Sequence, residues 1–145
     1  MMTITRADLQ TVLERYMTVQ RRRDPVALAE FHTPAGIVES PMYGTRVGRK
    51  AIEEAYRAFW TSFPDATYEL EAIVIEPPHM AAFTTVTATH MNDFFGLPGT
   101  KRRIEIRGSR LLRMDGELIM HERRIYDFTG VLVQVGVLRA KPAKP

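Results

Sequence analysis

The hydrophobic period of the chain changes near Pro64, and this change limits the folds open to it. Before Pro64 apolar residues recur at helical spacing, and after it they alternate in short runs typical of strands. Helices that precede strands favour an α+β fold with an antiparallel sheet over βαβ units. With 145 residues, 45% of them hydrophobic, the chain has enough apolar material for one core. We predict a single domain over residues 1–138 and a flexible Lys- and Pro-rich tail over residues 139–145.

Three helices and four strands are predicted. The first helix begins at Thr5, the second spans residues 26–31 and ends at Thr33-Pro34, and the third begins near Gly48 and ends at Pro64. The strands cover residues 67–76, 80–91, 103–114 and 117–127. Asp115-Gly116 lies between the last two strands and is a strong hairpin signal.

The pattern around this hairpin predicts which residues face the core. A three-residue loop with a left-handed Gly116 pairs Leu112 with Leu118 and Arg110 with Met120. The inward face then carries Ile104, Ile106, Gly108, Arg110, Leu112, Leu118, Met120, Glu122, Arg124 and Tyr126. The outward face is charged, with Ile119 and Ile125 as its main apolar members.

Three charged residues therefore lie on the apolar face: Arg110, Glu122 and Arg124. A buried charge must be paired, reach water or bind a polar ligand. Two interpretations stay open. One is an internal Arg–Glu–Arg ion network, and the other is a pocket whose guanidinium groups orient an anionic or enolisable ligand.

Composition excludes several classes of protein. Without cysteine, the chain has no disulfide, thiolate metal site or cysteine nucleophile. The net charge of +3 is dispersed among 17 acidic residues, so we expect no nucleic-acid partner. The four histidines lack metal-ligand spacing, and we expect no metal. There is no leader and no apolar run of about 20 residues, so we expect a cytoplasmic protein without membrane contact.

Several short motifs follow one another between His32 and Val137. They are residues 48–52 (GRKAI), 63–65 (FPD), 89–90 (TH), 95–100 (FGLPGT), 115–116 (DG) and 127–130 (DFTG), with Gln134 and Gly136. In their order and spacing they resemble the SnoaL-like polyketide cyclase family of the nuclear transport factor two-like superfamily. The resemblance implies a cone-shaped barrel, in which a curved antiparallel sheet wraps a deep pocket that three helices close. It also implies a cofactor-free enzyme and a homo-oligomer, which we expect to be a dimer.

The family's best-known members close a ring in a polyketide ester by an intramolecular aldol reaction, with an aspartate as acid/base and a histidine nearby. In this sequence the aspartate position falls on Arg124 and the histidine position on Arg110. An arginine stays protonated in proteins and cannot accept the substrate's proton. The resemblance therefore implies the family's pocket but not its acid/base residues.

The remaining candidates follow from this pocket. Arg110 and Arg124 are predicted to stabilise an enolate or bind a carboxylate. Glu122 is either the base or a carboxylate that the arginines clamp and make a poor base. His90 either orders the loop after it by a hydrogen bond or transfers a proton. Asp127 is predicted to cap the last turn, because Gly130 follows three residues later.

The walls of the pocket are predicted to include Glu39, Tyr56, Phe59, Trp60 and Tyr126. The first hypothesis is a cofactor-independent cyclase or isomerase acting on a hydrophobic carbonyl compound. The second is a domain of the same fold that binds a small hydrophobic or anionic ligand, or a protein partner, without catalysis. A third is an interaction domain that dimerises through the outer sheet face, which would need an exposed apolar patch there.

Overall fold

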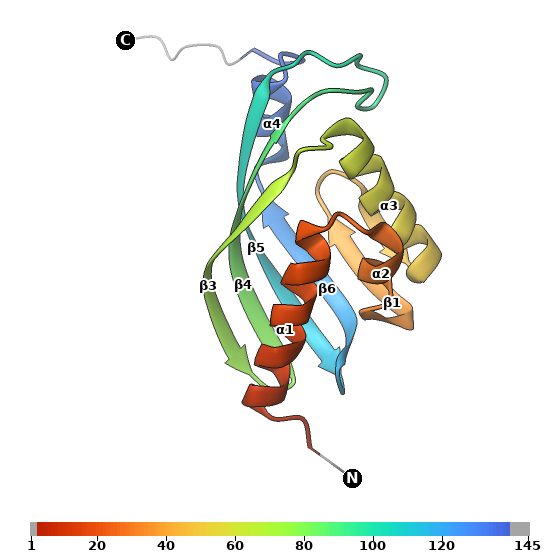
Figure 1. Cartoon of the computed structure of the whole chain (residues 1–145), viewed down its shortest axis with the longest axis vertical. Coiled ribbons are helices and arrows are strands. Elements are labelled where there is room, and N and C mark those ends of the chain that lie inside the picture. Colours follow the sequence, from red (N-terminus) through yellow and green to blue (C-terminus); the bar gives the residue numbers. More distant parts are fainter. Residues whose placement is uncertain (1–2, 140–145) are drawn as a thin grey trace.

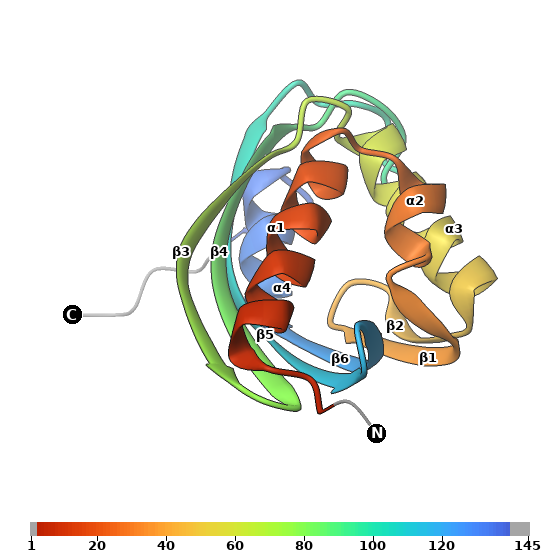
Figure 2. The same cartoon turned by 60° about the horizontal axis from the view of Figure 1, so that its bottom comes forward.

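The computed structural model describes residues 3–139, and its centre is one curved sheet with helices on the concave side (Figures 1 and 2). The helices are α1 (Arg6–Arg21), α2 (Pro25–Ala29), α3 (Arg49–Ser62) and α4 (Phe128–Gln134). The strands are β1 (His32–Ser40), β2 (Gly44–Val47), β3 (Thr67–Glu76), β4 (His79–Thr89), β5 (Arg103–Asp115) and β6 (Leu118–Tyr126). The predicted α+β class, the curved sheet and the three N-terminal helices are confirmed.

The six strands lie in the order β2-β1-β6-β5-β4-β3. All neighbours are antiparallel except β1 and β6, which run parallel. Strands β2 and β3 form two free edges, so the sheet is open where a closed barrel was expected. Its concave side is covered by α1 and α3, which contact its strands, and α2 packs against these two helices; α4 lies at the end of the sheet beside β5 (Figure 1).

The helices begin where the sequence predicts. Thr5 and Asp8 form a capping box at the start of α1, and Asp24 caps α2 by accepting a hydrogen bond from the Ala27 amide. The predicted end of the second helix was wrong, because α2 stops at Ala29 and Thr33-Pro34 lies within β1. Proline fits there because the pairing of β1 with β6 is irregular between His32 and Ile37, where no ladder hydrogen bond is required.

Strands β1 and β2 and helix α4 were not predicted. The cap at the start of α4 was predicted correctly, because the Asp127 side chain accepts a hydrogen bond from the Gly130 amide at 2.8 Å. Of the predicted tail, the structure describes Arg139, and residues 140–145 lie outside the described part of the chain.

The predicted register of the hairpin was wrong, although its faces mostly hold. Asp115 pairs with Leu118 across a two-residue loop, and Arg110 pairs with Arg124 instead of Met120. This shift of four residues along β6 is even, so residues far from the turn keep their faces.

Near the turn a bulge at Met120 changes the faces. Arg113 pairs with His121 and Met114 with Ile119, which leaves Met120 as an extra residue in β6. Ile119 is therefore 1% exposed in the core, whereas it was predicted to face outward. Leu118 and Met120, which were predicted to face the core, are partly exposed.

Candidate functional site

A cavity lies between the concave face of the sheet and helices α1 and α3. It holds about 790 Å³ of empty space, including its opening to solvent. Its wall is mainly apolar, with aliphatic and aromatic side chains, and its polar groups include two arginines from β5 and β6. The lining includes Gln20, Ser40, Met42, Tyr43, Arg46, Tyr56, Phe59, Tyr68, Arg110, Arg124 and Tyr126. Predicted wall residues Tyr56, Phe59 and Tyr126 are among them.

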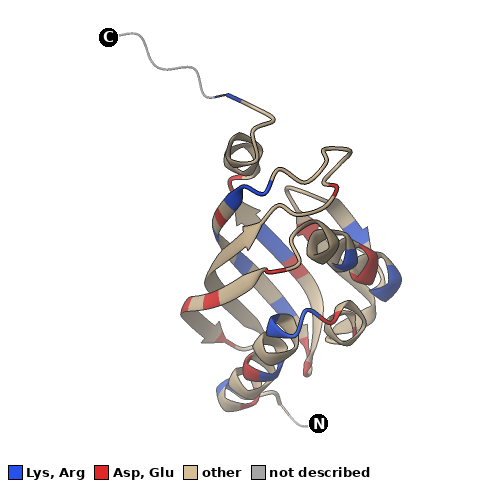
Figure 3. Ribbon diagram, turned by 45° about the horizontal axis from the view of Figure 1, so that its top comes forward, with Lys and Arg blue, Asp and Glu red and all other residues tan. Residues whose placement is uncertain are grey.

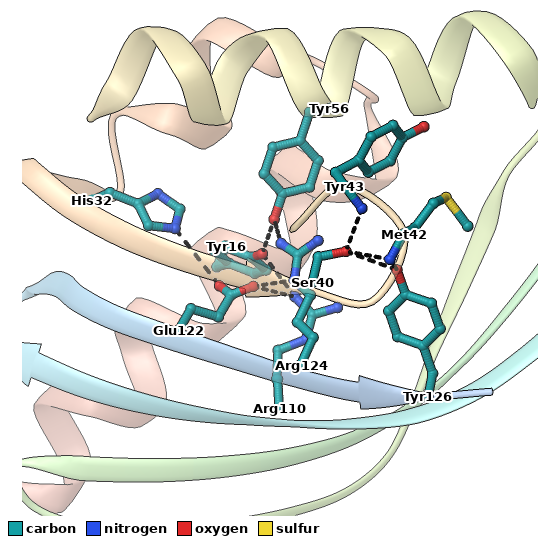
Figure 4. Close-up of polar contacts among 10 residues, drawn as sticks. All are labelled: Tyr16, His32, Ser40, Met42, Tyr43, Tyr56, Arg110, Glu122, Arg124 and Tyr126. Carbon is teal, nitrogen blue, oxygen red and sulfur yellow. Dashed lines mark hydrogen bonds and ion pairs between the residues drawn. The ribbon is translucent and has the colours of Figure 1, made fainter. Parts of the chain in front are cut away.

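A cluster of charges occupies one end of this cavity (Figure 4). Glu122 is fully buried and accepts a hydrogen bond from Nε of Arg124. Nη1 of Arg110 lies 3.8 Å from the same carboxylate oxygen. The side chains of Arg110 and Arg124 are 10% and 17% exposed. Two cations thus meet one anion, which leaves one positive charge in a mainly apolar cavity.

This arrangement keeps Glu122 and Arg124 ionised. Burial opposes ionisation of Glu122, but the charges of Arg124 and Arg110 outweigh burial and hold the pKa of its carboxyl well below its usual value. Burial is the largest influence on Arg124 and would lower its pKa, but Glu122 together with Tyr56 and Tyr16 outweighs burial and raises that pKa well above its usual value. Glu122 is therefore a clamped carboxylate, as the ion-network interpretation requires, and a weak base.

Two tyrosines join the arginines to the helices. The hydroxyl groups of Tyr16 on α1 and Tyr56 on α3 lie 2.7 Å apart. Tyr16 accepts a hydrogen bond from Arg110 at 2.8 Å, and Tyr56 accepts one from Arg124. Each guanidinium also lies over the ring of its tyrosine, at 5.7 Å and 4.9 Å from the ring centroids. The phenols therefore position the arginines.

His32 belongs to the same cluster and was missed from the sequence. It is fully buried, and its Nε2 lies 3.6 Å from Oε1 of Glu122. Its Nδ1 lies 3.3 Å from the carbonyl oxygen of Ala29, an arrangement that suits donation by the ring. In the sequence His32 stands beside Thr33-Pro34, which indicated a loop. Only the parallel pairing of β1 with β6 brings it to Glu122, 90 residues away.

Besides the buried Glu122, three predicted site residues lie outside the cavity wall. Glu39 is on the opposite face of β1 from the cavity, where it binds Nε2 of His121 at 2.6 Å, because alternate residues of a strand face opposite ways. Trp60 stacks on Tyr56 and donates a hydrogen bond to the Tyr68 hydroxyl at 2.6 Å. It supports the wall from behind.

The third residue is His90. It is fully buried between Phe63 and Phe94, and its Nδ1 accepts a hydrogen bond from the Thr100 amide at 3.3 Å. Backbone hydrogen bonds join His90 to Arg102 and Lys101 as well. This geometry is that of a residue that orders the loop over residues 91–100, and not of one that touches a ligand in the cavity.

The far end of the cavity is held by hydroxyl groups (Figure 4). Ser40 and Tyr126 share a hydrogen bond of 2.8 Å, and both bind the Met42 amide. The ring of Tyr43 contacts that of Phe95, in the loop after β4, with centroids 5.4 Å apart. These contacts tie the β1–β2 turn to the wall.

A family model described as SnoaL-like polyketide cyclase matches residues 10–135. The chain belongs to this family. The match covers both arginines, the tyrosine pair and Glu122, so the site lies within the family's domain. A comparison with curated proteins found no match.

Solved structures show the same fold at low identity. The hydroxylase candidate AclR from Streptomyces galilaeus has a TM-score of 0.82 at 22% identity, covering 95% of this chain and 91% of its own. The polyketide cyclase candidate IdmH from Streptomyces antibioticus has a TM-score of 0.74 at 22% identity, covering 88% of this chain and 97% of its own. A Catenulispora acidiphila protein of ketosteroid isomerase-like fold, in complex with trimethylamine, has a TM-score of 0.75 at 17% identity, covering 86% of this chain and 92% of its own.

Within residues 3–139, no group of three or more His, Asp or Glu side chains is placed to hold a metal ion. No helix of that part of the chain is long and apolar enough to cross a membrane. Lysine and arginine are spread over helices and strands in Figure 3, with acidic residues among them.

Proposed function

We propose that this protein binds a hydrophobic organic molecule with a carboxylate or an enolisable carbonyl, and that Arg110 and Arg124 hold the charged oxygen. The reaction we propose is ring closure or isomerisation of a polyketide-like carbonyl compound without a cofactor. One observation carries this proposal: a positive charge remains after Glu122 is paired, and it faces a mainly apolar cavity. Fixed donors aimed at a developing negative charge are effective where water is excluded.

The chemistry assigned to the arginines is electrophilic. In an aldol ring closure the α-proton leaves to water, and the enolate carbon then forms a bond to a second carbonyl carbon of the same molecule. The negative charge moves to that carbonyl oxygen, which then takes a proton from water. Atoms and charge balance without another reactant. Arg110 and Arg124 would stabilise each oxyanion in turn.

A second candidate is a ligand-binding protein without catalysis. It is favoured by the wall of the cavity, which has no carboxylate or imidazole among the described residues. Glu122 is clamped and His90 lies elsewhere, so no protein base is at hand for the α-proton.

Thermal-shift measurements with polyketide-like carboxylates and esters would test binding. We expect ligands to raise the melting temperature of the wild type and of Arg123→Ala but not of Arg124→Ala. Arg123 is the matched control because it is the neighbouring arginine of β6 and is exposed. Equal shifts for all three proteins would contradict the proposed site.

Deuterium exchange would separate the enzyme from the binder. An aryl alkyl ketone in D₂O exchanges its α-protons slowly without a catalyst, and NMR follows the exchange. The enzyme proposal predicts faster exchange with the wild type than with Arg124→Ala at equal occupancy. Binding without acceleration would leave the second candidate.

We further propose a homodimer formed through the outer face of the sheet. The predicted charged face carries an apolar patch in its centre, made by neighbouring strands β3 to β6. Its exposed members are Val74, Phe83, Leu111 and Ile125. A self-complementary apolar patch suits a two-fold interface. Light scattering should show a dimer for the wild type and a monomer for Ile125→Glu, and a wild-type monomer would exclude this interface.

A further inference from the structure

The hydroxyl groups of Tyr16 and Tyr56 hold two protons, and their hydrogen bonds use one of them. Arginine can only donate, so both phenol oxygens act as acceptors toward Arg110 and Arg124. The 2.7 Å bond between the two hydroxyls needs one donor. The other O–H has no acceptor among the described residues, and it must point out of the network.

Position relative to the cavity decides which hydroxyl keeps the unused proton. Tyr16 and Tyr56 are 3% and 6% exposed, but only Tyr56 lines the cavity. If Tyr56 donated to Tyr16, the Tyr16 O–H would be buried without a partner, which is unfavourable. If Tyr16 donates to Tyr56, the Tyr56 oxygen accepts from Tyr16 and Arg124, and its own hydrogen points into the cavity. The second arrangement leaves no buried O–H group without a hydrogen-bond acceptor or access to the cavity.

Burial also keeps both groups protonated. It is the largest influence on the pKa of Tyr56 and raises it well above its usual value, despite the nearby charge of Arg124. The pKa of Tyr16 is raised as well, first by burial and then by Glu122. At neutral pH the pair is therefore a donor and not a base.

We infer that Tyr56 donates a hydrogen bond to the ligand oxygen that the arginines hold, and that Tyr16 positions this hydrogen. The inference rests on the proposed function and adds a residue to it. Arg124 uses Nε and Nη2 within the protein, so the N–H groups of its Nη1 remain available beside the Tyr56 O–H. The ligand class that fits is a phenolate, enolate or carboxylate, whose oxygen accepts several hydrogen bonds.

The test uses 4-nitrophenol, whose neutral and ionised forms absorb differently, and 4-nitroanisole, a neutral compound of similar shape. Titration followed by absorbance gives the affinity and the ionisation of the bound phenol. We expect the wild type to bind nitrophenolate more tightly than nitroanisole and to lower the apparent pKa of the bound phenol. A role confined to folding would not change that ionisation.

Two variants separate the tyrosines. Tyr56→Phe should weaken nitrophenolate binding about 10- to 100-fold, as expected for a hydrogen bond to a charged group. Tyr16→Phe should weaken it less than about 5-fold, because Tyr56 still donates. Nitroanisole binding should change little in either variant. Wild-type affinity in Tyr56→Phe, or the larger loss in Tyr16→Phe, would overturn the inference.

A third protein covers the case in which Tyr56→Phe does not fold. Fluorotyrosine at position 56 keeps the shape of the side chain and makes its hydroxyl a stronger donor. Nitrophenolate should then bind more tightly, and weaker binding would overturn the donor role. If the wild type does not prefer nitrophenol to nitroanisole, the proposed function fails with it. If that preference is present but insensitive to Tyr56, only the present inference fails.

Discussion

The two faces of β6 carry similar residues in different environments. On the inner face Glu122 and Arg124 are held with Arg110, and the Glu122 carboxylate is fully buried. On the outer face His121 binds Glu39 at 2.6 Å, but these side chains are 43% and 44% exposed. Water screens the outer pair and not the inner cluster. Alternation along one strand thus separates a charge cluster suited to a ligand from a surface contact of little energetic weight.

The largest effect should follow from breaking the inner cluster. Arg124→Ala removes the hydrogen bond that Glu122 accepts from Nε and leaves Arg110, at 3.8 Å, as the remaining arginine beside the carboxylate. We expect the free energy of unfolding to fall by about 1.5–3 kcal/mol. Arg123→Ala, one residue away on the outer face, should change it by less than about 0.5 kcal/mol. Urea denaturation of both variants measures this contrast.

A second variant checks the cause. Arg124→Met keeps much of the bulk of the side chain but removes the hydrogen bond to Glu122, so it should be nearly as unstable as Arg124→Ala. Wild-type stability of Arg124→Met would mean that the packing of Arg124, and not its hydrogen bond with the carboxylate, produces the effect.

The pH dependence of stability should also originate on the inner face. The folded-state pKa of Glu122 is depressed, so its contribution is present above the usual carboxyl pKa of 4.5 and is lost as the pH falls through the lower folded value. The unfolding free energy should therefore fall below about pH 5. Glu122→Gln should flatten this decline, and an unchanged slope would contradict the assignment.

A smaller effect should come from the fit of the cavity wall. A Cβ atom at Gly108 would lie 3.0 Å from the Ile125 carbonyl oxygen and 3.0 Å from Cβ of Tyr126. Gly108→Ala should therefore cost about 1–3 kcal/mol through overpacking and should displace the Tyr126 ring. Ser109→Ala, at the next position, is the control. An unchanged free energy of unfolding for Gly108→Ala would show that β6 shifts to accommodate the added methyl group.

The smallest effect belongs to the outer pair. His121→Ala should lower the unfolding free energy by less than about 1 kcal/mol, because an exposed ion pair gains little. The same variant should leave nitrophenol binding unchanged. A loss comparable with that of Arg124→Ala would remove the distinction between the two faces.

Local patterns in the sequence determined much of this protein. Helical spacing predicted α1 and α3, Thr5 marked the start of α1, and alternation predicted β3 to β6, because these signals depend on residues close in the chain. Alternation also placed Arg110, Glu122 and Arg124 on one inward face, since a shift by an even number of residues leaves faces unchanged.

The tertiary structure decided the rest. The parallel contact of β1 with β6 brings His32 to Glu122, and the packing of α1 beside α3 joins Tyr16 to Tyr56. Neither pair has a local signal, because its members are distant in the chain. Glu39 was predicted to line the cavity, but alternate residues of β1 face opposite ways, and its side chain contacts His121 on the outer face. Sequence patterns determined which charges are buried, but long-range packing determined which partners they meet.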